Sequence, residues 1–169
     1  MVEQAYEQLK EGYFEEAVES FSSCLLQGPK EAKAYAGRGM AYFQLKNWPL
    51  AVSDFTKAKE LDAEDAENWI GLAMSLAMEN KMYEAISVFE SFLTDHPRHV
   101  RTHVQLAQLY YRLGVIGKGH QQLEAALAAR PSLSERRSIE KLKSEQLVLD
   151  KRRYYRPDFE ALRKQNRTA

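Results

Sequence analysis

Three histidines, His96, His99 and His103, are the residues whose types and spacing come nearest to a metal site. His99 and His103 are four residues apart, so a helix would place them on one face. A zinc site would also need an acidic or cysteine ligand on that face, and none is evident in the sequence. Pro97 separates His96 from the helix. We therefore interpret the cluster as a polar turn and expect no metal site.

Other groups that could support catalysis are equally isolated. The sequence contains no P-loop, nucleophile elbow, dinucleotide fingerprint or CxxC pair. Cys24 is the only cysteine, and its place among apolar residues predicts a buried thiol. The acidic run from Asp62 to Glu67 is interpreted as a solvated turn. We expect neither an enzyme nor a bound cofactor.

A basic and aromatic patch near the C-terminus could bind an anionic partner. It consists of Lys151, Arg152, Arg153, Tyr154, Tyr155 and Arg156. Such residues can hold phosphates while their rings stack on bases, but a solvated helix end would have the same composition. An acidic protein or a membrane surface could use the patch as well. The net charge is zero, yet twelve basic and six acidic residues follow position 129, so the tail carries +6 and the body −6.

The rest of the chain is organised by a step of 34 residues between large and small side chains. One column holds small residues, a second holds large ones, and two more hold mainly small ones. In chain order the columns are Ala17, Ala51, Ala85, Gly119; Phe21, Phe55, Phe89, Leu123; Ala5, Gly39, Ala73, Ala107; and Cys24, Ala58, Phe92, Ala126. A small residue lets a neighbouring helix bring a large one close. We therefore predict stacked helical hairpins, with one turn near Lys46 and Asn47.

This pattern resembles the tetratricopeptide repeat family. The early aromatic of the first helix is Tyr35 or Trp69, with His103 departing from it, and a small residue follows four positions later. The resemblance implies an all-α, right-handed superhelix of tandem helix-turn-helix hairpins. It predicts four repeats in residues 1–131, at about 1–31, 32–65, 66–99 and 100–133. Residues 132–169 would form a solvating C-terminal helix and a basic tail.

Two local patterns refine this outline. Ser132 with Glu135 is a capping-box pair, which predicts that a ninth helix starts there. The glycines from Gly114 to Gly119 are expected to loosen the start of the eighth helix.

The resemblance also implies a concave groove, lined by the first helix of each hairpin. Carried over by the repeat step, the partner-binding residues are Tyr6, Met40, Phe43, Ile70, Met74, Met78, Arg101, Val104, Gln108, Tyr111 and Arg112. Methionine adapts to varied partner shapes, and Gly37 and Gly71 are expected to leave floor space for a partner backbone. Alternatively, Met40, Ile70, Met74 and Tyr111 are core, or the chain's own C-terminal segment covers them.

The sequence therefore favours a non-catalytic module that binds a peptide or helix of another protein, as a scaffold, adaptor or chaperone. The alternative is a self-associating repeat protein whose basic C-terminal segment contacts nucleic acid or an acidic partner. A short first helix leaves an apolar edge that would favour a homo-oligomer. No apolar run is long enough for a membrane span or signal peptide, so the expected compartment is the cytosol.

Overall fold

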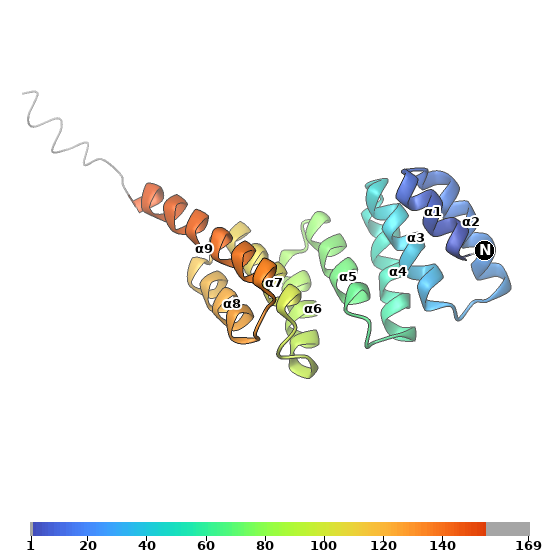
Figure 1. Cartoon of the computed structure of the whole chain (residues 1–169). Helices are drawn as coiled ribbons and strands as arrows, with labels where there is room; N and C mark the ends of the chain where they lie inside the picture. Colours follow the sequence, from blue (N-terminus) through green and yellow to red (C-terminus); the bar gives the residue numbers. More distant parts are fainter. Residues whose placement is uncertain (1, 155–169) are drawn as a thin grey trace, which may run out of the picture.

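The computed structural model describes residues 2–154, without the side chains of residues 148 and 150–154. Within that range every element is an α-helix (Figure 1). The helices are α1 (Val2–Glu11), α2 (Phe14–Gln27), α3 (Ala32–Gln44), α4 (Trp48–Leu61), α5 (Ala66–Met78), α6 (Met82–Asp95), α7 (Val100–Arg112), α8 (Ile116–Ala128) and α9 (Leu133–Tyr154). The all-α prediction is confirmed.

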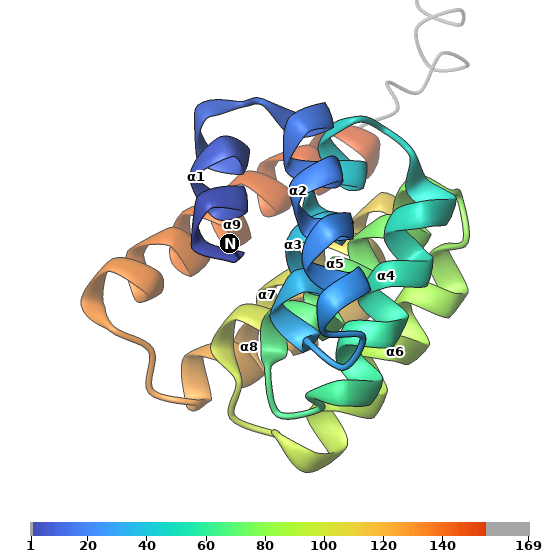
Figure 2. The same cartoon turned by 90° about the vertical axis from the view of Figure 1, so that its right-hand side faces the viewer.

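The helices pair into four hairpins that stack in chain order. Each second helix contacts both its partner and the first helix of the next hairpin. The stack is elongated, with α1 at one end and α9 at the other (Figure 1). Seen from the α1 end, successive hairpins are rotated relative to one another, so the stack winds as a superhelix (Figure 2).

Each hairpin turns at a residue in the left-handed backbone region. These residues follow the 34-residue step: Gly12 (φ 89°), Lys46 (φ 59°), Asn80 (φ 66°) and Gly114 (φ 75°). The N–H of the next residue then donates to the carbonyl five positions earlier, at 2.9 Å in all four turns. This bond satisfies a carbonyl at the end of the first helix. The predicted turn near Lys46 and Asn47 is confirmed.

The predicted columns form the core. Ala17, Ala51 and Ala85 are fully buried, as are Phe21 and Phe89, while Phe55 is 2% exposed. Burying one such ring contributes roughly 1.5–3 kcal/mol. Cys24 is a buried free thiol, as expected.

A largely buried ion pair connects α3 with α4, and a further hydrogen bond connects α3 with α2. The guanidinium of Arg38 donates to both carboxylate oxygens of Asp54, at 2.8 Å each, and to Ser22 Oγ at 3.1 Å. Asp54 is 5% exposed, so removing Arg38 would leave a buried carboxylate without its ion-pair partner. The contact fixes α3 against α2 and α4, and no repeat position in the sequence predicts it.

The start of α9 follows the capping-box prediction. Glu135 accepts hydrogen bonds from the backbone N–H of Ser132 at 2.8 Å and from its hydroxyl at 2.6 Å. Ile139, 2% exposed, and Leu142 then pack in a cluster with residues of α7 and α8. In the second half of α9, Leu147 and Leu149 are exposed.

No helix of residues 2–154 is long and apolar enough to cross a membrane.

The two glycines near the start of α8 should respond oppositely to substitution by alanine. A Cβ on Gly117 would meet nothing within 4 Å, whereas a Cβ on Gly119 would overlap the ring of Tyr111. Gly117→Ala should raise the free energy of unfolding by about 0.5 kcal/mol, because it removes backbone freedom from the unfolded chain. Gly119→Ala should lower it by about 1–3 kcal/mol through overpacking. Urea denaturation measures both, and the same sign for both variants would contradict this packing.

Candidate protein-binding groove

An apolar pocket of 290 Å³ lies among the first helices of three successive hairpins. Its apolar side chains are Met40 and Phe43 of α3 and Ile70 and Met74 of α5. Met40, Phe43 and Met74 are partly exposed, while Ile70 is 5% exposed. The remaining lining is Gln44, Phe55, Glu67, Gly71, Arg101 and Gln105. The pocket can therefore take an apolar side chain from outside the chain.

The packing of two glycines corrects one expectation. Gly37 and Gly71 do not leave room for a partner backbone, because the chain's own phenylalanines fill that space. A Cβ on Gly37 would overlap the ring of Phe21, and a Cβ on Gly71 would overlap the ring of Phe55. Each glycine instead lets the second helix of one hairpin pack closely on the first helix of the next.

A second pocket, of 300 Å³, continues the groove toward α1. It shares Met40 and Glu67 with the apolar pocket, so the two hollows adjoin. Its other lining residues are Tyr6, Ala32, Lys33, Ala36, Asp62, Asp65 and Asn68. The groove therefore changes from apolar at its middle to polar toward the N-terminal hairpin.

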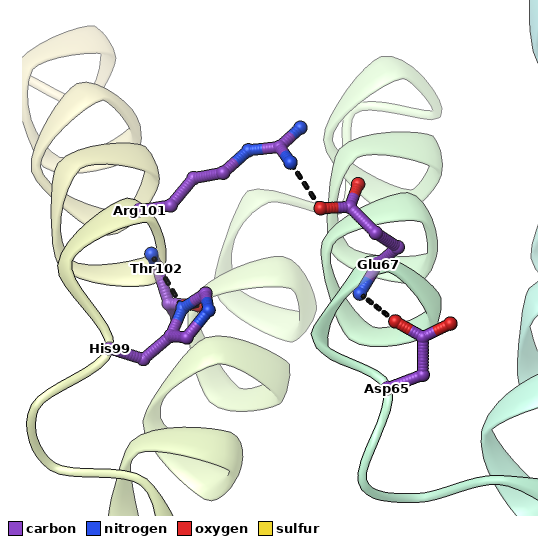
Figure 3. Close-up of polar contacts among 5 residues, drawn as sticks. All are labelled: Asp65, Glu67, His99, Arg101 and Thr102. Carbon is purple, nitrogen blue, oxygen red and sulfur yellow. Dashed lines mark hydrogen bonds and ion pairs between the residues drawn. The ribbon is translucent and has the colours of Figure 1, made fainter.

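The polar pocket has a negative character. Asp65 caps α5 by accepting from the backbone N–H of Glu67 at 3.0 Å, and Asp62 accepts from that of Asp65 at 3.3 Å (Figure 3 draws the first). Within residues 2–154, no cationic side chain pairs with either carboxylate. Burial raises the pKa of Tyr6, and the nearby charges of Asp65 and Glu31 raise it further. A cation entering this pocket would meet two carboxylates without an ion-pair partner.

An ion pair between Arg101 of α7 and Glu67 of α5 crosses the groove (Figure 3). The two side chains are 54% and 42% exposed. Exposed pairs contribute only about 0–1 kcal/mol. A guest segment could therefore separate Arg101 from Glu67 at little energetic cost.

The structure brings together about half of the predicted groove residues. Met40, Phe43, Ile70, Met74 and Arg101 line the apolar pocket, and Tyr6 lines the polar one. The other five line neither pocket: Met78, Val104, Gln108, Tyr111 and Arg112.

Tyr111 follows the alternative interpretation, in which it belongs to the core and not to the groove. It is 8% exposed, and its ring packs over Gly119 of α8. Its hydroxyl lies 2.9 Å from Nδ1 of His120. Tyr111 faces α8 because Gly119 leaves room for its ring, so it is a core residue of the last hairpin.

Sequence reasoning missed several groove residues. Phe55 belongs to a second helix, so the assumption that only first helices line the groove excluded it. Asp62 and Asp65 belong to the acidic run that was interpreted as a solvated turn; both are exposed, as expected, and they also line the polar pocket. Nothing in the sequence distinguishes these two carboxylates from the other acidic residues of the run.

The histidines serve the fold at the junction of α6, α7 and α8. His103 Nε2 lies 3.0 Å from the carbonyl oxygen of Pro97, and its Nδ1 lies 2.7 Å from Oε1 of Gln122. One repeat earlier, Trp69 Nε1 donates to the carbonyl of Ala63 at 2.8 Å. His103 therefore keeps the hydrogen bond of the aromatic column while departing from its residue type.

His96 and His99 also have local roles. The ring of His96 stacks on Phe92 with centroids 4.4 Å apart, and His99 caps α7 by accepting from the N–H of Thr102 at 3.3 Å. In the part of the chain that the structure describes, no group of three His, Cys, Asp or Glu residues could hold a metal ion.

The basic patch of Lys151, Arg152, Arg153, Tyr154, Tyr155 and Arg156 falls largely outside the description. Residues 151–154 end α9, but their side chains are not described, and Tyr155 and Arg156 lie beyond the described residues. The same holds for the rest of the tail. Anion binding by this patch stays a prediction from the sequence.

Comparison with known proteins identifies a matching sequence profile and several related sequences. A sequence profile of the tetratricopeptide repeat matches residues 32–65. Superkiller protein 3 of Schizosaccharomyces pombe is 27% identical over 124 residues, which are 68% of this chain and 9% of that protein. The mitochondrial import receptor subunit TOM34 of Homo sapiens is 34% identical over 65 residues, or 38% of this chain and 21% of that protein. The chain thus spans less than a quarter of either relative.

Solved structures share the fold over a larger part of the chain. A thermophilic TPR protein of Thermus thermophilus, TTC0263, superposes with a TM-score of 0.73 at 19% identity, covering 85% of this chain and 78% of its own. A crystal structure of MamA superposes with a TM-score of 0.68 at 18% identity, covering 96% of each chain. Both solved structures share the arrangement of helices of this chain.

The cap of α7 should make stability depend on pH. Burial, and then the nearby His96, lowers the pKa of His99. The unfolded chain therefore binds a proton more readily than the folded one, so stability is lost as the pH falls through about 6.5 toward the lowered value. His99→Asn keeps a capping acceptor and removes the titration. We expect its free energy of unfolding to fall less than that of the wild type between about pH 7 and 5.

Denaturant titrations at several pH values measure this difference. Identical pH slopes for the wild type and His99→Asn would contradict the role assigned to His99.

Proposed function

Because the chain is a tetratricopeptide repeat protein, a family that typically mediates protein–protein interaction, we propose that its concave groove binds an apolar segment of a partner protein. The partner inserts an apolar side chain among Met40, Phe43, Ile70 and Met74. The binding is non-catalytic, and the chain acts as a scaffold, adaptor or chaperone.

The apolar pocket is the observation that carries this proposal. It lies among three hairpins, so its walls are held by the same packing that holds the stack. Two of its walls are methionines, whose flexible thioethers adapt to different side chains. A volume of 290 Å³ accommodates one large apolar side chain together with part of its backbone.

The rim of the groove supports recognition by charge. Arg101 and Glu67 border the apolar pocket, and Asp62 and Asp65 border the polar one. A guest with an apolar anchor followed by a basic residue would satisfy both hollows at once. Charges at a rim mainly set specificity and association rate, while the buried anchor supplies most of the affinity.

A peptide display experiment tests the proposal without a known partner. Random peptides on phage are selected on the chain of residues 1–169, and the enriched peptides are measured as synthetic peptides by fluorescence anisotropy. We expect an apolar anchor with a basic neighbour. Met74→Glu places a charge in the pocket and should weaken the binding of these peptides at least about tenfold.

Met78→Glu is the matched control. It makes the same substitution one helical turn later on α5, at a side chain that is 42% exposed and lines neither pocket. It should leave the affinity unchanged. Equal losses for both variants, or selected peptides that bind Met74→Glu as well as the wild type, would place the binding site elsewhere.

A further inference from the structure

The C-terminal segment of this chain is basic, and the polar pocket of the groove is negative. Residues 151–169 contain seven basic and two acidic side chains, and they also carry Tyr155, Phe159 and Leu162. The body that precedes residue 130 carries the compensating negative charge. The apolar pocket would bind an apolar side chain of such a segment, and the negative polar pocket would bind a neighbouring cationic one.

We propose that the C-terminal segment of one copy docks in the concave groove of a second copy. This inference rests on the proposed function, since it uses the same groove, and it names the occupant. Phe159 and Leu162 enter the apolar pocket among Met40, Ile70 and Met74. The adjacent Arg163 and Lys164 reach the polar pocket.

The groove supplies the complementary groups. Glu67 already has a cationic partner in Arg101, whereas Asp62 and Asp65 have only backbone donors within the described chain. Among the described residues, Lys33 is the one basic side chain that lines the polar pocket. Two carboxylates against one lysine leave a net negative charge, which a basic segment neutralises.

The direction of α9 favours docking between two copies over docking within one copy. α9 packs on the last hairpin through Ile139 and Leu142 and ends at the opposite end of the molecule from α1 (Figures 1 and 2). The described chain therefore ends, at the last turn of α9, remote from its own polar pocket, which contains Tyr6 of α1. If a second copy lies beyond that end, the C-terminal segment of the first copy can reach the groove of the second without reversing its direction.

The segment is long enough to occupy the groove. The fifteen residues 155–169 span up to about 50 Å when extended. Neighbouring helices pack about 10 Å apart, so the path from α7 to α1 across the first helices is about 30 Å. One segment can thus cover both pockets. Such a contact joins two different surfaces and generates head-to-tail assemblies.

Two variants of the chain of residues 1–169 test the docking by sedimentation velocity. Met74→Glu alters the groove, and the double variant Phe159→Glu, Leu162→Glu alters the segment. Wild type should show a mass that rises with concentration, and each variant should weaken association at least about tenfold. The control Gln165→Glu, Asn166→Glu adds the same charges to the segment without removing its anchors, and it should still associate.

Mixing the two variants is the decisive test of docking between copies. One retains an intact segment and the other an intact groove, so the mixture should form a one-to-one dimer while each variant alone stays monomeric. A mixture that stays monomeric overturns docking between copies, and so does a wild type that is monomeric up to about 1 mM. If the wild type is monomeric but still captures displayed peptides in a Met74-dependent way, only this inference fails. If it captures none, the proposed function fails as well.

Discussion

The ring of Phe55 lies between two glycines, and the geometry of the groove depends on that contact. A Cβ on Gly39, in the same hairpin, would lie 3.2 Å from the ring, and a Cβ on Gly71, in the next hairpin, would overlap it. The ring therefore sets both the packing within one hairpin and the approach of the following one. Phe21 against Gly37 repeats the contact one step earlier. Because protein interiors are close-packed, each such pair fixes a helix separation within a narrow range.

The apolar pocket is a consequence of this packing. Phe55 and Gly71 form part of its lining, so the contact that joins two hairpins also closes the base of the hollow between α3 and α5. At the next junction Gln105 replaces the glycine of this column, and α6 and α7 contact each other less extensively than α4 and α5 do. The side chain of Gln105 instead lines the pocket beside Arg101. The same repeat position thus serves packing in two junctions and the surface of the groove in the third.

Much of the fold could be predicted from the sequence, because the large and small residues of the core recur at one fixed step. The buried Phe21 and Phe89 and the turn near Lys46 and Asn47 follow from that step, while the cap at Ser132 follows from a local rule. The site was harder to predict. A step of 34 residues assigns Tyr111 to the groove, but its orientation depends on Gly119, which lies on a different helix. Likewise, Gly37 and Gly71 look like open space until the rings of Phe21 and Phe55 are placed. The acidic turn before α5 is exposed, as predicted, but its place beside the polar pocket depends on packing between hairpins.

The most direct measurement of the central claim uses the methionine methyl groups of the chain. Its five methionines include Met40 and Met74 in the apolar pocket and Met78 and Met82 outside it. In a methyl NMR titration with a synthetic peptide of residues 151–169, or with a peptide selected by display, a groove that binds apolar segments predicts shifts for Met40 and Met74 alone. Equal shifts at Met78 and Met82, or no shift at Met40 and Met74 when the peptide is bound, would contradict it.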